Sequence, residues 1–421
     1  MDAKPAPQAT PSNSIRPPVR NSAGLIVLLA SAALGAEAGA VLGPVVVLIR
    51  DDFRLSPGQA GLVISMHGLL IAACAPVAGA LADRVGTKRL LTASLIAYGV
   101  FGGLGALSGN YPLLLLIRAL FGVAVGVMTV AYTVGMLTLR HSRDRATVMG
   151  YQSGIGNVGQ VLWPLLAGIV GGLGIGWRGP FLLYLVALPL AAAAVWLLPD
   201  TPRKNNSQPS AHSADTVRMR SVIRDAPVLL WLYALIFIVA VLLYVLVAFL
   251  PQRLNQLGVS GPLEVAGFLA AATGPAAVVG MAYGRLQAHL RPRTILVLAL
   301  ASPALGFALL ALSARPLLLP FGAALIGVGI GLVMPAVPTL ASESVTAAAL
   351  GRATSWIYAL FPLGNFAAPL LLGPLADGPF GFRAVFGVSA AISLLSALAY
   401  FAGLRHVRFG NGCRTGQESE T

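Results

Sequence analysis

The chain consists of long apolar runs separated by short polar segments. A helix of about 20 apolar residues is long enough to cross the ~30 Å hydrocarbon core of a bilayer. Inside lipid every backbone N–H and C=O group must be paired within its own segment, so we predict that each run is an α-helix. Twelve runs meet this condition, at about 23–49, 59–82, 90–108, 112–139, 146–172, 179–198, 227–250, 262–284, 294–313, 317–341, 350–373 and 382–404.

The amino-acid composition supports a membrane protein. Of the 421 residues, 57% are hydrophobic and only 10% are charged, against about 25% charged residues in soluble domains. The net charge of +14 could suggest a nucleic-acid partner, but the basic residues lie in short loops and do not form one continuous surface. We therefore expect an all-α polytopic membrane protein whose partners are the lipid bilayer and a small molecule, with no nucleic acid.

Lys and Arg are distributed unevenly between the two sets of loops. Most of the 28 lie in the two tails, the central linker and the loops that follow even-numbered spans. Positive residues mark the cytoplasmic side of a membrane protein, so both termini are expected in the cytoplasm of a plasma or bacterial inner membrane. The opposite loops hold Arg50, Arg54, Arg178, Arg253, Arg315 and Arg383.

The longest loop divides the spans into two sets of six and is rich in Pro, Asn, Ser and Arg, as solvated linkers are. The sequence therefore predicts a disordered cytoplasmic tail, a first six-helix bundle, a cytoplasmic linker, a second six-helix bundle and a second tail. These parts are residues 1–22, 23–198, 199–226, 227–405 and 406–421.

The two halves contain an internal repeat at an offset of about 201–205 residues. Gly122 and Gly126 in the fourth span correspond to Gly327 and Gly331 in the tenth, and PLLAG in the fifth span corresponds to PLLLG in the eleventh. Internal duplication is typical of transporters, whose substrate site lies near the midplane between the repeats.

One charged turn follows the second span and reads GALADRVGTKR. It resembles the loop motif of the major facilitator superfamily, and the likeness extends over all twelve spans. The resemblance implies two pseudo-symmetric six-helix bundles that rock against each other, so that a central site opens to alternate sides. The motif residues are Gly79, Asp83, Arg84, Gly86, Lys88 and Arg89.

Within this motif, Gly79 is expected to allow close approach of a neighbouring helix and Gly86 a tight reversal. The family resemblance implies that Asp83 docks at the N-terminus of the eleventh helix, near 350–352, where the helix dipole stabilises a carboxylate. This contact would latch the halves together in the outward-open state. The second-half copy has Gly284 in place of the aspartate. The alternative is a solvated turn with ordinary topology-setting charges.

Glu37 and Arg118 are the clearly ionisable residues well inside the predicted spans. A charge at the bilayer centre costs at least ~2.5–3.5 kcal/mol and usually faces the bundle interior. We expect Glu37 to face the central cavity, with Gly35, Gly39 and Gly43 packing on a neighbour, and to exchange a proton near neutral pH. A hydrogen bond between helices is the alternative role for Glu37.

Arg118 begins LIRALFGVAVG, which resembles the arginine and G-x-x-x-G motif of the family's fourth helix. The resemblance assigns Arg118 to proton transfer, and the alternative is that its side chain extends outward to the membrane surface. His67 also falls within a span, where a packed histidine is the favoured interpretation.

The fifth span reads GYQSGIGNVGQVLWPLLAG and resembles the antiporter motif of the same family. Gly150, Gly159, Pro164 and Gly168 match its spacing, whereas Trp163 replaces a glycine of the motif. A Gly-rich packing helix with no bearing on transport direction is the alternative. Residues that could line the cavity are Tyr132, Gln152, Asn157, Gln160, Tyr244, Trp356, Tyr358 and Asn365.

These features favour a monomeric secondary transporter that couples proton entry to efflux of a small amphipathic organic compound or drug. The alternative with the same fold is proton-coupled uptake of a small organic anion, with Arg118 as the substrate clamp. A membrane enzyme or receptor is disfavoured, because the five histidines are scattered and no H-E-x-x-H, C-x-x-C or phosphate-loop motif is present. We expect no cofactor and no metal site.

Overall fold

The structure, a computed structural model, describes residues 22–36, 38–139, 145–199, 228–345 and 347–403. In these ranges the chain is helical with short turns. The first half contains α1 (Ser22–Ala36), η1 (Ala40–Val45), α2 (Val46–Phe53), α3 (Pro57–Val85), α4 (Thr87–Leu104), α5 (Tyr111–Leu139), α6 (Arg145–Val170), α7 (Gly179–Leu182), η6 (Leu183–Val186) and α8 (Ala187–Leu197). The second half contains α10 (Val228–Gln256), α11 (Pro262–His289), α12 (Pro292–Leu312), α13 (Leu319–Ser344), α14 (Ala347–Ala376) and α15 (Gly381–Gly403).

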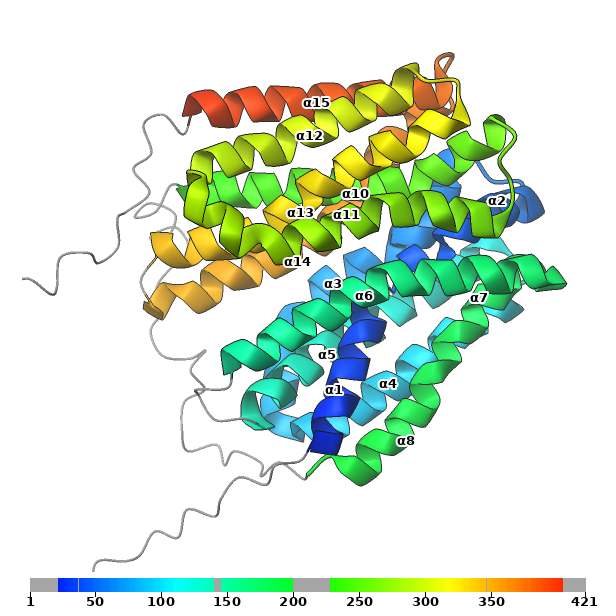
Figure 1. The fold of residues 1–421 in the computed structure, drawn as a ribbon. Helices are drawn as coiled ribbons and strands as arrows, with labels where there is room; N and C mark the ends of the chain where they lie inside the picture. Colours follow the sequence, from blue (N-terminus) through cyan, green and yellow to red (C-terminus); the bar gives the residue numbers. More distant parts are fainter. Residues whose placement is uncertain (1–21, 37, 140–144, 200–227, 346, 404–421) are drawn as a thin grey trace, which may run out of the picture.

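Ten of the described helical stretches are long and apolar enough to span a membrane, and the bent pair Ala23–Gly35 and Ala40–Phe53 gives an eleventh. One of the ten, Gly150–Leu197, is 48 residues long. It reverses direction after the break at Gly171–Ile175, so that α8 returns beside the bundle (Figure 1). Counted as two passes, this stretch accounts for the twelve spans that the sequence predicts.

The first predicted span differs from expectation because it is not one continuous helix. α1 ends at Ala36 and η1 begins at Ala40, with a bend of 43° between the two helical parts. Pro44 lies inside η1, where it removes a backbone donor. The three glycines of this span do pack closely, although they meet different helices: Gly35 faces Tyr132 of α5, and Gly43 faces Leu269 of α11.

The internal repeat is reproduced in the packing of the helices. In the first half α5 packs on α3, and in the second half α13 packs on α11. A Cβ atom at Gly122 would meet the backbone of His67, and one at Gly327 would meet the backbone of Ala272. Because both pairs differ by 205 residues, the same glycine contact joins equivalent helices in each half.

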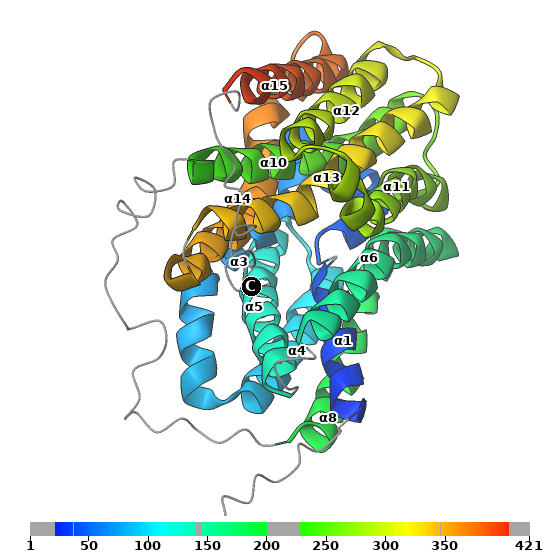
Figure 2. The same cartoon turned by 60° about the vertical axis from the view of Figure 1, so that its left-hand side comes forward.

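The halves meet through α3 with α14 and through α6 with α11. They diverge toward the side on which the two termini and the central linker leave the described helices, which we call the linker end (Figures 1 and 2). At the other end, which we call the far end, a Cβ at Gly373 would lie 2.7 Å from the Cα of Gly58, and one at Gly61 would lie 2.6 Å from Pro369. A Cβ at Gly79, Gly150, Gly154 or Gly284, toward the linker end, would meet no atom within 4 Å. Among the described residues, the tight contacts between the halves lie toward the far end and the middle of the helices, where a Cβ at Gly68 would lie 2.5 Å from the carbonyl oxygen of Pro362.

A glycine substitution can test the packing of α13 on α11. Gly331→Ala should destabilise the protein, because the new Cβ would lie 3.0 Å from the backbone carbon atoms of Ala276 and still closer to its carbonyl oxygen. We expect a loss of roughly 1–3 kcal/mol, the usual cost of overpacking, and a lower midpoint of thermal unfolding in detergent.

The matched control is Gly274→Ala in α11, whose Cβ would meet no atom within 4 Å. Because Ala is favoured over Gly in a helix by roughly 0.5–1 kcal/mol, this variant should be as stable as the parent or slightly more so. Equal melting of the two variants would contradict the close approach of α11 and α13.

Candidate functional site

Arg118 is completely enclosed by the first half, with 1% of its surface exposed. Its Nε donates to the carbonyl oxygen of Val63 at 3.0 Å, and Nη2 donates to that of Ala38 at 3.1 Å. Nη1 lies 3.5 Å from the hydroxyl of Tyr184. The side chain does not extend outward to the membrane surface, so that alternative is wrong. The guanidinium is held by acceptors from the break after α1, from α3 and from η6.

Aromatic side chains surround the buried guanidinium of Arg118. The carbon Cζ of Arg118 lies 4.7 Å from the centre of the Phe121 ring and 5.9 Å from that of Tyr184. Tyr184 donates to the carbonyl oxygen of Ala38 at 2.9 Å, and Tyr98 donates to that of Leu34 at 2.9 Å. Cation–π attraction and the hydrogen bonds of the guanidinium stabilise a charge that hydrocarbon alone would not accept.

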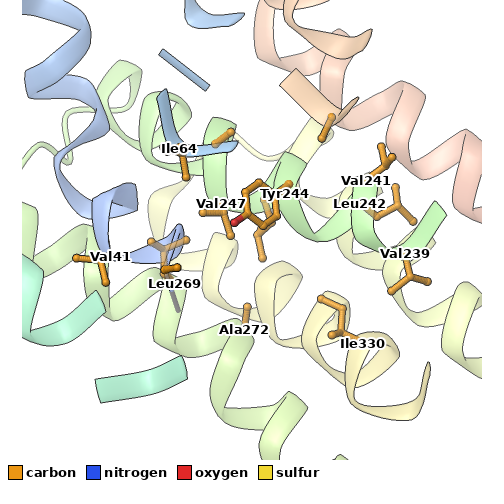
Figure 3. Packing of buried hydrophobic residues seen from close by; sticks show 14 of the residues in the cluster. Val41, Ile64, Val239, Val241, Leu242, Tyr244, Val247, Leu269, Ala272 and Ile330 are labelled. Atoms are coloured by element: carbon orange, nitrogen blue, oxygen red, sulfur yellow. The ribbon is translucent and has the colours of Figure 1, made fainter. Parts of the chain in front are cut away.

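His67 links this cluster to the second half of the chain. The side chain is buried, as expected for a packed histidine, but its two ring nitrogens face polar groups that the sequence did not indicate. Nδ1 lies 3.3 Å from Nη2 of Arg118, and Nε2 lies 3.4 Å from the hydroxyl of Tyr244 in α10. Figure 3 shows Tyr244 with its hydroxyl oxygen directed toward the side on which Val41 and Ile64 of the first half lie.

Glu37 lies outside the described residues, so its predicted orientation toward the cavity stays a prediction. The next residue along the chain, Ala38, is described, and its carbonyl oxygen accepts hydrogen bonds from both Arg118 and Tyr184. The backbone beside Glu37 is therefore fixed to the buried cation.

The polar cluster has no counterpart at the equivalent positions of the second half. At the offset of 205 residues, Arg118 corresponds to Ala323 and His67 to Ala272. Ala323 is fully buried and Ala272 nearly so, in the matching contact between α13 and α11. The duplicated helices thus keep the same glycine packing while only the first copy carries the ionisable residues.

The charged turn forms the reversal between α3 and α4, and Gly86 has the positive φ of 90° that favours glycine there. Arg84 and Arg89 are exposed, and Lys88 is half-buried. In the described part of the chain no atom lies within 4 Å of the Cβ position of Gly79, so the expected close approach is not seen in this conformation. The side chains of Asp83 and of residues 350–352 lie outside the described part, so the latch itself is not tested.

The motif of the fifth predicted span packs α6 against two other helices. A Cβ at Gly159 would lie 2.9 Å from the carbonyl oxygen of Ala33 in α1, and Trp163 donates its indole N–H to the same oxygen at 3.0 Å. A Cβ at Gly168 would lie 2.7 Å from Ala266 in α11. Pro164 is buried within α6, whereas Gly150 meets no atom within 4 Å of its Cβ. Trp163 thus anchors α6 to α1 in place of the missing glycine.

The candidate cavity residues fall into different environments. Tyr132, Tyr244 and Asn365 are buried, and Gln152, Asn157 and Gln160 are half-buried. Tyr358, in α14 of the second half, is 66% exposed. Seven residues separate Tyr358 from Asn365, which places them on one face of α14, while Trp356 is about 200° away from Tyr358.

Of the three candidates in α14, Tyr358 and Asn365 therefore share a face. The amide oxygen of Asn365 is buried and has no hydrogen-bond partner in the described part of the protein. Among the described residues no group of three or more His, Cys, Asp or Glu side chains could hold a metal ion.

A sequence model of the Major Facilitator Superfamily matches residues 25–323 and 275–412. The multidrug resistance protein MdtG of Yersinia enterocolitica serotype O:8 / biotype 1B is 27% identical over 379 residues, which cover 87% of this chain and 89% of that protein. The protein of the same name from Escherichia coli O81 is 27% identical over 406 residues, covering 93% and 97%.

Two solved structures show the same fold. A bacterial homolog of the human lysosomal transporter Spinster, in an inward-facing and unoccupied conformation, has a TM-score of 0.77 at 17% identity and covers 91% of this chain and 97% of its own. The xylose transporter XylE from E. coli, in an inward open conformation, has a TM-score of 0.73 at 15% identity, covering 90% and 95%. Because the sequence model matches nearly the whole chain and the helices adopt this shared fold, the chain belongs to the major facilitator superfamily of membrane transporters.

Proposed function

We propose that this chain exports a small amphipathic organic compound in exchange for protons, with Glu37 as the coupling residue and Arg118 as its partner. The observation that carries the proposal is the double hydrogen bond from Arg118 and Tyr184 to the carbonyl oxygen of Ala38, the residue after Glu37. The relatives named multidrug resistance proteins support the direction and the substrate class.

The proposed chemistry uses the fixed position of the Arg118 charge. A cation favours the ionised form of a nearby carboxylate, whereas an apolar environment favours the protonated form. When the bundles rock, the environment of Glu37 changes while Arg118 stays bound to carbonyl oxygens of its own half. A proton would thus be accepted from one side of the membrane and released on the other.

We infer that the described conformation opens toward the cytoplasm. The positive-inside rule places the linker end in the cytoplasm, and the close contacts of Gly58 with Gly373 and of Gly61 with Pro369 lie at the other end. In this proposal the moving bodies are residues 23–198 and 227–405, and the Asp83 latch would form only after the linker end closes.

Uptake of an organic anion with Arg118 as its clamp receives less support. A clamp must present its donors to the cavity, but Arg118 is buried and directs Nε, Nη1 and Nη2 to Val63, Tyr184 and Ala38. A substrate carboxylate would have to displace these acceptors.

Glu37→Gln tests the coupling. In inverted membrane vesicles with an acidic lumen, the parent protein should accumulate a fluorescent amphipathic dye as protons leave. The Gln variant cannot exchange a proton, so accumulation against a gradient should fall to the background, while downhill dye exchange continues.

The matched control for Glu37→Gln is Glu264→Gln, which neutralises an exposed carboxylate in the first turn of α11. It should accumulate dye as the parent does. Gradient-driven accumulation by the Glu37 variant would refute the coupling role, and failure of the parent itself to accumulate dye would refute the direction.

Arg118→Lys separates the two functions proposed for this residue. Lysine keeps the charge but is a compact point charge with three donors, so it cannot reproduce the forked contacts to Val63, Ala38 and Tyr184. An unpaired buried acceptor costs about 1–3 kcal/mol, so we expect dye transport to fall roughly fivefold or more. If Arg118 were an anion clamp, the variant would instead retain uptake of a labelled organic anion.

Gly373→Val tests alternating access. Its side chain would collide with the backbone of Gly58 and should shift the population toward a conformation open at the far end. An overpacking cost of roughly 1–3 kcal/mol corresponds to a shift of about fivefold to more than a hundredfold, measurable as distances between spin labels on the two halves. The control is Gly267→Val on α11, where no atom lies within 4 Å of the Cβ position and no shift is expected.

A further inference from the structure

The contact between His67 and Tyr244 joins the polar cluster of the first half to α10 of the second half. The side-chain hydrogen bonds of Arg118 described above end on groups of its own half, and His67 is one of these. His67 extends the connection, because its other ring nitrogen lies 3.4 Å from the hydroxyl of Tyr244. A chain of three side chains therefore extends from the buried cation to the partner bundle.

The direction of the hydrogen bonds in this chain follows from the chemistry of arginine. A guanidinium can only donate, so in a hydrogen bond between Nη2 of Arg118 and Nδ1 of His67, which lie 3.3 Å apart, the ring nitrogen is the acceptor; the carbonyl oxygen of Ile64, 3.5 Å from Nη2, is the competing acceptor. A neutral imidazole with an acceptor at Nδ1 carries its proton on Nε2. This N–H then faces the hydroxyl oxygen of Tyr244 and donates to it. Arg118 thus sets the tautomer that allows His67 to bind the second half.

Glycine at position 39 makes room for this contact. A Cβ there would collide with both the Tyr244 hydroxyl and the His67 ring. The offset of 205 residues pairs Gly39 with Tyr244, so the two equivalent positions of the repeat face each other, one without a side chain and one with a large polar one. The two halves therefore differ at this pair of positions, where the His67 side chain lies against Gly39 and Tyr244.

We propose that His67 is a positioning residue, which transmits the fixed orientation of Arg118 to Tyr244 and so stabilises the conformation closed at the far end. The inference rests on the proposed rocking of the two halves, but it does not depend on the substrate or on proton coupling. When the halves separate at α10, the bond to Tyr244 breaks while the bond between Arg118 and His67 stays within the first half.

The surroundings of His67 agree with this role. The Phe121 ring lies 6.3 Å from the His67 ring, and Gly122 lies against the His67 backbone. These contacts, together with the hydrogen bond to Arg118, fix the orientation of the imidazole ring. Tyr244 is the residue of the second half that presents a polar atom to it, among the hydrogen bonds of the described part.

Tyr244→Phe removes the hydroxyl and keeps the ring, so the fold should be preserved. Pairs of spin labels would report on the two ends: Gly109→Cys with Ser260→Cys at the far end, and Arg89→Cys with Arg291→Cys at the linker end, in a background with Cys74 and Cys413 replaced by Ser. All four labelled positions are exposed. Loss of one hydrogen bond should move the equilibrium roughly two- to tenfold toward the conformation open at the far end.

Tyr98→Phe is the matched control, because it removes a buried tyrosine hydroxyl that bonds within the first half, to the carbonyl oxygen of Leu34. It should leave the distance distributions unchanged. An unchanged distribution for Tyr244→Phe, or an equal shift in both variants, would overturn the proposal.

Substitutions of His67 provide a second measurement. His67→Gln carries an oxygen that can accept from Arg118 and an N–H that can donate to Tyr244, so it should retain most of the parent distribution. His67→Leu offers neither group and should shift as Tyr244→Phe does. Equal shifts in the Gln and Leu variants would show that His67 acts only by packing.

Nuclear magnetic resonance of protein labelled with ¹⁵N-histidine tests the tautomer directly, with the His67 signal assigned by its loss in His67→Gln. We expect the neutral form with the proton on Nε2. A proton on Nδ1 would overturn the proposed chain even if the transport function holds. Conversely, a failed Glu37→Gln experiment would leave this tautomer and the distance shifts intact.

Discussion

A guanidinium group inside a membrane-spanning bundle must be surrounded by acceptors, and the surroundings of Arg118 meet this requirement with backbone carbonyl oxygens. This need accounts for several features of the first half. α1 stops at Ala36, and the carbonyl oxygen of Ala38 turns to Arg118 and Tyr184. α3 and α5 approach each other closely at Gly122, which brings Val63 within reach of Nε. The same charge also sets which ring nitrogen of His67 can accept a hydrogen bond.

The two halves share the same helix packing but differ in their buried ionisable residues. The glycine contacts of α5 on α3 and of α13 on α11 are equivalent, because they depend only on close backbone approach. The side chains beside them are free to differ, and Ala323 and Ala272 occupy the positions of Arg118 and His67. The second half consequently supplies packing surface and a hydroxyl at Tyr244, while Arg118 and His67 of this cluster belong to the first.

Much of this fold is encoded locally and could be predicted from the sequence. The spans follow from hydropathy and bilayer thickness, so most predicted ends lie within a few residues of the observed ones, as for α5 at Tyr111–Leu139. The repeat was visible because glycines at close contacts cannot be replaced easily. The break after Ala36 and the open surroundings of Gly79 were not predicted, since each depends on where a distant helix lies in one conformation.

The candidate site was only partly predictable for the same reason. Arg118 stood out because charge is rare in apolar spans, but Tyr184 and Tyr98 did not, although a tyrosine in an apolar run usually needs a partner for its hydroxyl. The partners of His67 lie 51 and 177 residues away along the chain, beyond the reach of any local pattern.

The contact between Gly58 and Gly373 has a consequence for what the protein can carry. Main chain lies against main chain there, with no side chain between them. Because neither residue has a side chain, the two backbones approach each other more closely here than any other pair of residues would allow. Peptide backbone also offers no distinguishing charge or ring to a passing molecule. In the proposed export cycle, discrimination among cargoes would then depend on side chains deeper in the protein, and the contact of Gly58 with Gly373 would form behind compounds of different shape.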